Sequence, residues 1–403
     1  MFARRTEWPL EPNALTREIA RRRERGLAIV DLTESNPTRC GFRYDSGAIL
    51  RALAQPAALL YEPEPQGPVV ARRAVSAYYA ERGVHVEPGQ IFLTASTSDA
   101  YSHLFRLLAD SRDAVLVPQP SYPLFDFLAG LSDLEIVPYP LVYDSGWRID
   151  LDELAVQLGR GERTSHPARA LVVVHPNNPT GSYVRADERR ALFELCRCHH
   201  LALIADEVFS DYAFGAEAAS ADRAPTHAGL DASLTFTLSG LSKVSALPQM
   251  KLAWIVVSGP AAERRAAIDR LEIVADTYLS VSAPVAAALP ELIETRRAIQ
   301  PQIVDRLQRN LAELDRRLIS CGGRARRLQI EGGWYAVVQL APEGGTPLDD
   351  DFFAVGLARD DGVVVHPGHF YGFATSGYVV LSLLPPPEIF AGGIEKLLAR
   401  VSR

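Results

Sequence analysis

A carboxylate and an amine, Asp206 and Lys243, each come directly after a short apolar run in this chain. A lysine amine forms a Schiff base with an aldehyde, and a carboxylate keeps a nearby ring nitrogen protonated. These are the two demands that a pyridoxal phosphate cofactor makes of a protein. Each residue alone has an ordinary explanation, because an aspartate at a strand end is usually a helix cap and a lysine after serine usually lies at the surface. The prediction therefore depends on the surrounding motifs.

Three further turns place polar residues directly after apolar runs. Residues 94–100, Thr-Ala-Ser-Thr-Ser-Asp-Ala, lie between an expected strand and an expected helix, where free N–H groups and the helix dipole would hold a phosphate. A simple N-cap at Thr97 or Ser98 explains the same residues. Residues 120–123, Pro-Ser-Tyr-Pro, and 177–181, Asn-Asn-Pro-Thr-Gly, are also typical of generic turns.

A hydrophobic share of 47% among the 403 residues is enough for a sizeable core, and the net charge of −7 indicates a soluble protein. A net charge of −7 argues against a nucleic-acid partner, and the basic run at 21–25 is explained by a solvated helix face. Four cysteines show neither a disulfide framework nor metal-ligand spacing, so we expect reduced thiols, no metal site and a cytoplasmic location. No apolar run is long enough to cross a bilayer and no leader is recognisable, so no membrane partner is expected.

Apolar runs alternate with helical patterns along much of the chain, as in an α/β sheet covered on both faces. Buried strands are expected at residues 91–94, 114–118, 170–175, 201–205 and 252–257, and helices at 98–109, 124–131 and 185–199. A long helical pattern at 284–320 leads to a Gly-Gly pair. Beyond it, strands at 334–340 and 378–384 are expected in a smaller second domain.

Taken in order from Asn36 to Ser382, the motifs resemble those of the pyridoxal phosphate-dependent aminotransferases of class I/II, fold type I, in the aspartate aminotransferase-like superfamily. The resemblance implies an α/β fold. Its large domain would contain a mostly parallel, mixed seven-stranded sheet covered by helices, and a smaller α/β domain would accompany it. We expect the large cofactor-binding domain at residues 45–285, and the small domain at 1–44 and 286–403.

The resemblance also implies roles for the residues of the cofactor site. Lys243 would carry the cofactor and act as general base and acid, while Asp206 would keep the cofactor ring protonated. The other implied contacts are Ser96, Thr97, Ser242 and Lys251 for the phosphate, Tyr122 stacked on the ring, and Asn178 at the phenolic oxygen.

Lys251 stands eight positions past Lys243, where the family usually has an arginine. A lysine keeps the positive charge but loses the planar two-pronged contact, so we expect the phosphate to be held with less geometric restraint. Tyr61, ahead of Gly67 and Arg72, matches a tyrosine that reaches the phosphate of the neighbouring subunit. The resemblance therefore implies a homodimer whose interface contributes to the site.

Phe209, three residues after Asp206, stands where the family commonly has a tyrosine. A phenylalanine cannot donate a hydrogen bond to the phenolic oxygen of the cofactor. Because the phenolate is then less well stabilised, we expect the Schiff base at Lys243 to keep its proton to higher pH than in relatives with the tyrosine.

Val380 stands where the family has an arginine that forks onto the α-carboxylate of the substrate. Either another basic group has taken over this role, or the substrate is not held by its α-carboxylate in the usual way. Asn36 and Arg39 belong to a loop that the family places over the substrate, and Arg39 is the first substitute, although a solvated loop arginine explains it equally well. His366 and His369 lie in another approaching loop and are as readily explained as polar surface.

The resemblance implies an aminotransferase that moves an amino group from an amino acid to a 2-oxo acid by a ping-pong mechanism. Three alternatives stay open: another carbanion reaction such as β-elimination, decarboxylation or racemisation; an amine or side-chain transaminase without the carboxylate clamp; and a regulator that senses the cofactor or a ligand. The expected partners are a small amino acid or amine and a 2-oxo acid, with no nucleic acid and no membrane. The sequence does not identify the donor or the acceptor.

Overall fold

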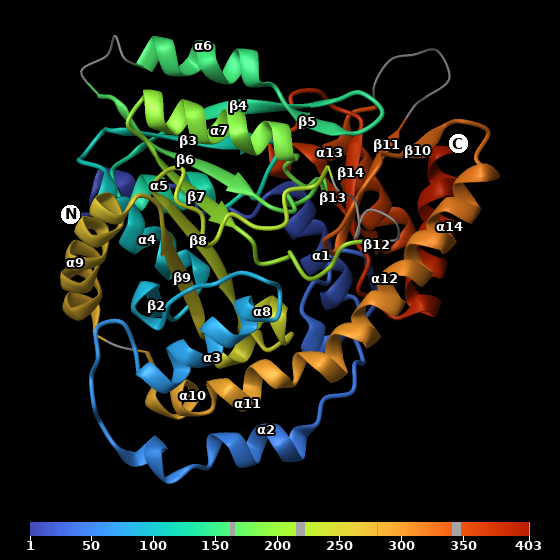
Figure 1. Ribbon diagram of the computed structural model, residues 1–403. Coiled ribbons are helices and arrows are strands. Elements are labelled where there is room, and N and C mark those ends of the chain that lie inside the picture. Colours follow the sequence, from blue (N-terminus) through green and yellow to red (C-terminus); the bar gives the residue numbers. More distant parts are fainter. Residues whose placement is uncertain (162–165, 215–221, 280, 341–347, 403) are drawn as a thin grey trace.

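Figure 1 shows the computed structural model of the chain, which describes residues 1–161, 166–214, 222–279, 281–340 and 348–402. Its strands are β1 Val30–Asp31, β2 Ile91–Thr94, β3 Ala114–Gln119, β4 Glu135–Tyr143, β5 Trp147–Ile149, β6 Ala168–Val174, β7 Ala202–Asp206, β8 Thr235–Gly240, β9 Ala253–Ser258, β10 Ala325–Arg327, β11 Tyr335–Leu340, β12 Val363–Val364, β13 His366–Pro367 and β14 Tyr378–Ser382. Its α-helices are α1 Ala14–Glu24, α2 Ser46–Leu53, α3 Val69–Ala80, α4 Thr97–Leu108, α5 Phe125–Leu131, α6 Leu151–Gly161, α7 Ala186–Cys198, α8 Leu241–Val244, α9 Ala261–Tyr278, α10 Ala283–Ala287, α11 Leu289–Glu294, α12 Arg296–Ile319, α13 Asp350–Gly356 and α14 Pro387–Val401.

A mixed sheet with the strand order β2-β9-β8-β7-β6-β3-β4-β5 forms the centre of the larger part of the molecule. The pairs that join β8, β7, β6, β3 and β4 are parallel, whereas β9 is antiparallel to both β2 and β8. The strands β3, β6 and β7 are nearly continuous runs of buried aliphatic residues, as expected of strands covered on both faces. The predicted α/β fold is confirmed. The expected seven strands become eight, because the short strand β5 pairs antiparallel with β4 at the edge.

Helices cover both faces of this sheet (Figure 1). Successive residues of a strand point to opposite faces. In β6, Val172 packs in a cluster with α4, α5 and α9, while Leu171 and Val173 pack in a cluster with α6 and α7. On the same face as α6 and α7, the helices α2, α3, α10 and α11 cover β2 and β9. None of the helices in the described ranges is long and apolar enough to cross a membrane.

A four-stranded sheet, with the order β10-β11-β14-β13, forms the centre of the smaller part. Val338 of β11 and Leu381 of β14 point into a hydrophobic cluster that includes α12 and α14. Near this sheet, β1 pairs in parallel with β12, and α1 contacts α13. Segments from both ends of the chain therefore surround the small sheet.

The helical pattern expected at residues 284–320 corresponds to three helices, α10, α11 and α12, rather than to one. Pro284 and Pro290 each lie in the first turn of a helix, where a missing N–H group is tolerated. Leu289 and Leu292 of α11 pack in the cluster beside β2 and β9. They lie beyond residue 285, and the division of the chain at that residue stays a prediction.

Candidate active site

The carboxyl ends of four adjacent parallel strands carry the residues that the motifs single out. Tyr122 follows β3, Asn178 follows β6, Asp206 ends β7, and Lys243 lies in α8 directly after β8. The backbone N–H of His175 donates to the carbonyl oxygen of Asp206 at 2.8 Å, which joins the ends of β6 and β7. The structure therefore brings these four candidates to one edge of the large sheet, the edge at which open α/β sheets bind ligands.

Asp206 is buried, and its carboxylate has two protein donors. Tyr101 Oη in α4 donates to Oδ2 at 3.2 Å, and the backbone N–H of Val208 donates to Oδ1 at 3.2 Å. Burial raises the pKa of Asp206 to about 6, against the opposing effects of these hydrogen bonds and of Lys243. Desolvation disfavours the charged carboxylate here, so a cationic partner at this position would be strongly attracted.

The amine of Lys243 lies among aromatic rings. Its Nζ is 4.4 Å from the centre of the Trp334 ring and 5.1 Å from the centre of the Phe209 ring. Tyr212 Oη donates to the carbonyl oxygen of Lys243 at 2.6 Å and so fixes the backbone of α8. Burial lowers the pKa of Lys243 to about 8, although the carboxylate of Asp206 works in the opposite direction. This amine therefore loses its proton more readily than the amine of an exposed lysine.

Asn178 lies in a turn that its neighbour Asn177 holds in place. Asn177 Oδ1 accepts a hydrogen bond from Ser121 Oγ at 2.9 Å, and its Nδ2 donates to Thr180 Oγ1 at 2.9 Å. Asn178 is buried, yet its Oδ1 has no hydrogen-bond partner among the residues described. Because a buried polar atom without a partner is costly, this amide fits a site that a polar ligand completes.

The turns after Thr94, after Gly240 and before Ala253 meet at one point of the sheet edge, because Ala253 of β9 pairs with both Thr94 of β2 and Gly240 of β8. The four residues predicted to bind the phosphate lie in these turns or in the first turn of the helix that follows: Ser96, Thr97, Ser242 and Lys251. The pairing thus brings all four to the same region, beside the first turn of α4.

Ser96 is the N-cap of α4, and its Oγ accepts a hydrogen bond from the backbone N–H of Asp99 at 3.1 Å. The side chains of Thr97, Ser242 and Lys251 make no hydrogen bond within the part of the chain that is described. The amino-terminal end of a helix favours an anion, and Lys251 adds a positive charge. These groups fit a phosphate.

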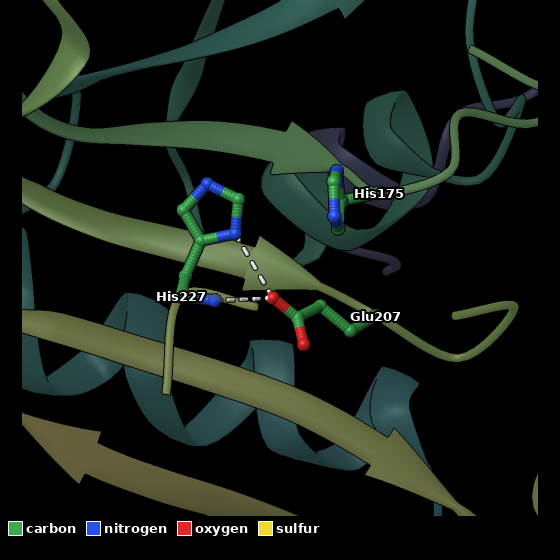
Figure 2. A group of neighbouring side chains, drawn as sticks. All are labelled: His175, Glu207 and His227. Atoms are coloured by element: carbon green, nitrogen blue, oxygen red, sulfur yellow. Dashed lines mark hydrogen bonds and ion pairs between the residues drawn. The ribbon is translucent and has the colours of Figure 1, made fainter. Parts of the chain in front are cut away.

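A buried carboxylate that no motif predicted, Glu207, follows Asp206 in the chain, and Figure 2 shows it beside His175 and His227. Its Oε1 accepts hydrogen bonds from the backbone N–H of His227 at 2.7 Å and from Nδ1 of the same residue at 2.9 Å. Thr226 Oγ1 donates to Oε2 at 2.5 Å. Although burial works in the other direction, the hydrogen bond from His227 lowers the pKa of Glu207. The negative charge of Glu207 in turn raises the pKa of Asp206.

His175 completes this cluster, in which a nitrogen or oxygen atom of His175, Glu207 and His227 lies within 4.8 Å of each of the others. His175 Nδ1 accepts from the backbone N–H of Val184 at 3.0 Å, and Nε2 lies 2.9 Å from the carbonyl oxygen of Ala224. These contacts occupy both ring nitrogens of His175, which leaves no lone pair for a cation. We therefore interpret the cluster as a hydrogen-bonded support for the end of β7.

Val380 lies in β14 within an apolar cluster and is only 1% exposed. It packs with Trp147 of β5, with Leu328 and Val337, and with Tyr371. Aliphatic and aromatic groups therefore surround the position where the family has its carboxylate-binding arginine. Trp147, from the edge strand β5, occupies part of the space around this position.

Among the described residues, three of the predicted ones make no hydrogen bond or ion pair with Lys243. Asn36 uses its Oδ1 to accept from the backbone N–H of Thr38 at 3.1 Å and from the hydroxyl of Thr38 at 2.8 Å. Arg39 is exposed, and its guanidinium makes no hydrogen bond or ion pair with any described residue. Tyr61 is 73% exposed, in the segment between α2 and α3.

Motif reasoning missed several side chains of the site, which come from distant segments. Tyr101 holds Asp206, and Trp334 lies over Lys243. Of the two loop histidines named from the sequence, His366 has its Nδ1 3.0 Å from Tyr371 Oη, beside the Val380 cluster, and His369 is exposed. The sequence offered only weak signals for these residues. Tyr101 is a tyrosine one helical turn past Thr97, and Trp334 is an aromatic residue after the glycines at 332–333, and neither pattern is specific to a cofactor site.

The family model for "Aminotransferase class I and II" matches residues 45–388 of the chain. The chain belongs to this family. As a class I and II aminotransferase it is 28% identical over 396 residues to the alanine aminotransferase of Mycobacterium tuberculosis (strain ATCC 25618 / H37Rv), a match that covers 94% of this chain and 86% of that protein. It is also 28% identical over 275 residues to the glutamate-pyruvate aminotransferase AlaA of Escherichia coli (strain K12), which covers 68% of this chain and 65% of that one.

Solved structures show the same fold for this aminotransferase. An aminotransferase from Escherichia coli superposes with a TM-score of 0.83 at 22% identity, covering 100% of this chain and 98% of the other. An aspartate aminotransferase single mutant from Thermus thermophilus gives a TM-score of 0.81 at 23% identity, with 100% and 99% covered.

The class I and II aminotransferases use pyridoxal 5′-phosphate, and this chain is a pyridoxal phosphate-dependent enzyme that transfers an amino group between an amino acid and a 2-oxo acid. β-Elimination, decarboxylation, racemisation and a sensing role are not favoured by these relatives. The unpartnered Asn178 amide, the open hydroxyls beside α4 and the buried Asp206 are the features of the site that fit the cofactor.

Proposed function

We propose that Lys243 is the catalytic amine of this aminotransferase and that Asp206 is the carboxylate that holds the cofactor ring. The observation that carries the proposal is the placing of both residues at the ends of the adjacent strands β7 and β8, where each shifts the pKa of the other. When bound, pyridoxal phosphate supplies an electron sink for the carbanion that forms at the substrate Cα.

Once the donor amine has replaced it on the cofactor, Lys243 would take the proton from the substrate Cα and deliver it to the cofactor carbon that the amine is bound to. The second half of the cycle would run the same transfer in reverse. A lowered pKa, about 8, suits an amine that must serve as both base and acid. The rings of Phe209 and Trp334 keep water from its Nζ and confine the amine to one side of the site. Tyr101 and Val208 orient the Asp206 carboxylate toward the ring nitrogen.

Asn178 and Tyr122 are proposed to orient the cofactor ring, the first through its unpartnered amide and the second by stacking. Tyr122 is partly buried beside Phe125, with ring centres 6.2 Å apart and planes at 90°. Ser96, Thr97, Ser242 and Lys251 are proposed to bind the phosphate, supported by their common place beside α4.

We further propose that the enzyme is a homodimer in which Tyr61 reaches the phosphate of the partner subunit. Support comes from the apolar side chains that α2 and the segment after it expose, since Leu50 is 66% exposed, Leu59 90% and Leu60 60%. Contiguous exposed apolar residues of this kind mark interfaces. Arg72 holds the segment in place by donating to the carbonyl oxygen of Gly67 at 2.7 Å.

The amino donor and the 2-oxo acid acceptor are proposed to enter past the loop of Asn36 and Arg39. The relatives named for alanine, for glutamate and pyruvate, and for aspartate make small amino acids the first donors to test. A cytoplasmic location is proposed from the free thiols of the four cysteines.

The chain contains only three lysines, Lys243, Lys251 and Lys396, which makes a covalent test decisive. Borohydride reduction of the cofactor-loaded protein, followed by peptide mass mapping, should mark Lys243 alone. Loss of the visible cofactor band with an amino acid, and its return with a 2-oxo acid, should occur in the wild type and not in Lys243→Ala. Labelling of either other lysine, or turnover by Lys243→Ala, would refute the assignment.

A further inference from the structure

The face of the small sheet that carries Val380 also carries polar side chains close to it. Val380 of β14 pairs with Val337 of β11 and with His366 of β13. Directly paired residues of antiparallel strands point to the same face. Tyr335, two residues before Val337 and paired with Ser382, therefore shares this face as well.

Val380 itself offers nothing to a carboxylate. Its neighbours Trp147, Leu328 and Val337 are apolar or aromatic, and 99% of the valine is covered. A carboxylate placed against such groups without a hydrogen-bond donor would lose its hydration and gain nothing in exchange. Hydrogen-bond donors lie instead at the polar rim of this cluster.

Tyr371 and Tyr335 supply hydroxyl groups at that rim. Tyr371 belongs to the Val380 cluster, and its carbonyl oxygen accepts from the backbone N–H of Ser121 at 2.9 Å, which places it beside the loop of Tyr122. The ring centre of Tyr335 is 6.2 Å from that of Phe209, which is itself in contact with the catalytic lysine. The backbone of Tyr371 therefore lies beside the Tyr122 loop, and the ring of Tyr335 lies beside Phe209, so both tyrosines come from segments that border the site.

These phenols remain protonated, so they act as donors. Burial raises the pKa of Tyr371 well above its ordinary value, and the neighbouring Tyr335 and Tyr122 add to this. Burial likewise raises the pKa of Tyr335, although a side-chain hydrogen bond with Ser35 works in the opposite direction. A neutral hydroxyl can donate one hydrogen bond to a carboxylate oxygen.

His366 contacts the hydroxyl of Tyr371, so the direction of the phenolic hydrogen depends on which ring nitrogen of His366 is protonated. Its Nδ1 lies 3.0 Å from Tyr371 Oη. Burial lowers the pKa of His366, so the ring is neutral and carries one N–H. When Nδ1 carries that hydrogen and donates it to Tyr371 Oη, the phenolic hydrogen is free to point away from the histidine.

We propose that Tyr371 and Tyr335 bind the α-carboxylate of the amino donor in place of the family arginine, with His366 as the positioning residue that orients the Tyr371 hydroxyl. The proposal rests on the proposed role of Lys243, because the carboxylate is attached to the carbon from which that amine takes a proton. Neutral donors bind a carboxylate less strongly than a guanidinium does. The enzyme therefore accepts α-amino acids with weak affinity for the carboxylate, and its substrates remain amino acids rather than simple amines.

The test compares each amino acid with the amine that lacks its carboxylate, using L-alanine with ethylamine and L-phenylalanine with phenethylamine. In Tyr371→Phe, the KM for the amino acid should rise about 10-fold or more with little change in kcat, while the amine is unaffected. Tyr378→Phe is the matched control, because Tyr378 lies on the same sheet face and its hydroxyl accepts from Gln339 Nε2 at 3.2 Å. Equal losses for both members of a pair, or a wild type that prefers the amine, would overturn the proposal.

A second pair of variants tests the positioning role. His366→Phe removes the N–H and should raise the KM for the amino acid alone. His366→Asn retains an amide N–H and should restore most of the affinity. No difference between these two variants would overturn the role of His366.

Direct binding provides a readout that does not depend on turnover. Calorimetric titration of the cofactor-loaded protein with 3-phenylpropanoate should show binding in the wild type and in Tyr378→Phe, and at least 10-fold weaker binding in Tyr371→Phe. Unchanged binding in Tyr371→Phe would overturn the carboxylate site. If the wild type binds the acid but converts no donor, the role of Lys243 fails while the carboxylate site stands.

Discussion

The Nζ atom of Lys243 lies 4.4 Å from the centre of the Trp334 indole ring, which is fully buried. The face of an indole attracts an ammonium group, so this ring favours one resting place for the amine. Trp334 is itself held edge-to-face by Phe209, with ring centres 5.3 Å apart, and by Tyr212 at 5.1 Å. Because Tyr212 also holds the lysine carbonyl oxygen, ring and amine are fixed relative to one another.

Replacing Trp334 with leucine should lower kcat by about 10- to 100-fold with little change in the KM for the donor, because the amine loses the ring that orients it. Steady-state kinetics at saturating donor would measure this. Trp254→Leu is the matched control, since Trp254 is also fully buried and its Nε1 contacts Tyr79 Oη rather than Lys243. Equal losses of kcat in both variants, after correction for the folded fraction, would show that Trp334 acts only through stability.

Asp206 should destabilise the cofactor-free protein at neutral pH. Its pKa rises from 3.8 in the unfolded chain to about 6 in the folded site because of burial, so the folded state holds the proton more tightly. A carboxyl group whose pKa is raised on folding does not destabilise the folded state at a pH below its pKa in the unfolded chain. Its destabilising effect grows as the pH rises from that pKa to the pKa of the folded state. Asp206→Asn should therefore raise the free energy of unfolding of the cofactor-free protein by up to about 3 kcal/mol near pH 8, and by about 1 kcal/mol less near pH 5.

The cofactor should reverse the sign of this effect. With pyridoxal phosphate bound, the carboxylate has a cationic partner, so Asp206→Asn should now lose stability relative to the wild type. Chemical denaturation of the wild type and of Asp206→Asn, each with and without the cofactor and at both pH values, would measure the four differences in the free energy of unfolding. If Asp206→Asn is less stable than the wild type without the cofactor, the inference that the buried Asp206 carboxylate destabilises the cofactor-free protein is wrong.

Strands and motif residues were predictable because their signals are local. The runs that became β3, β6 and β7 are apolar, β-rich and bounded by turn residues, and a polar residue directly after such a run lies at the sheet edge. The positions of Asp206 and Lys243 at the sheet edge could therefore be predicted from the sequence alone. The same reasoning joined residues 284–320 into one helix, because a proline in the first turn of a new helix does not interrupt the apolar period.

The residues that surround this pair were not predictable, because tertiary packing brings them from distant parts of the chain. Tyr101 is 105 positions away from Asp206, the carboxylate that it contacts. Trp334 and Tyr371 come from the small-sheet region, and each looks like an ordinary core aromatic in the sequence. The sequence showed that Val380 stands where the family has its arginine. The packing of Trp147 from β5 against Val380 could not be predicted, because it depends on the register of three strands.

Phe209→Tyr should lower the pH at which the lysine–cofactor linkage loses its proton by roughly one unit, because the added hydroxyl donates to the phenolic oxygen and stabilises the phenolate. Phe209 lies 5.1 Å from Lys243 Nζ, within reach of this region. A pH titration of the visible cofactor band gives the midpoint. Phe214→Tyr adds the same hydroxyl five residues away and should leave the midpoint in place. A midpoint that rises in Phe209→Tyr, or moves equally in both variants, would refute the expectation.

Lys251→Ala should weaken the binding of pyridoxal phosphate by about 10- to 100-fold, because a charge-assisted hydrogen bond to the phosphate is lost. Lys251→Arg should bind at least as tightly as the wild type, since the guanidinium adds the two-pronged contact. Fluorescence titration of the cofactor-free protein would give the dissociation constants. Lys396→Ala is the control, because the Lys396 amine instead donates to the carbonyl oxygen of Asp361 at 3.0 Å.

Pyridoxal without its phosphate separates a phosphate contact from a general loss of the site. It should bind to Lys251→Ala and to the wild type with the same affinity, because the ring contacts proposed for Asp206, Asn178 and Tyr122 do not involve the phosphate. A variant that loses affinity for pyridoxal and for pyridoxal phosphate alike would mean that Lys251 supports the turn before β9 rather than the phosphate. That outcome would leave the amino-terminal turn of α4 and the hydroxyls of Ser96, Thr97 and Ser242 as the whole anion site.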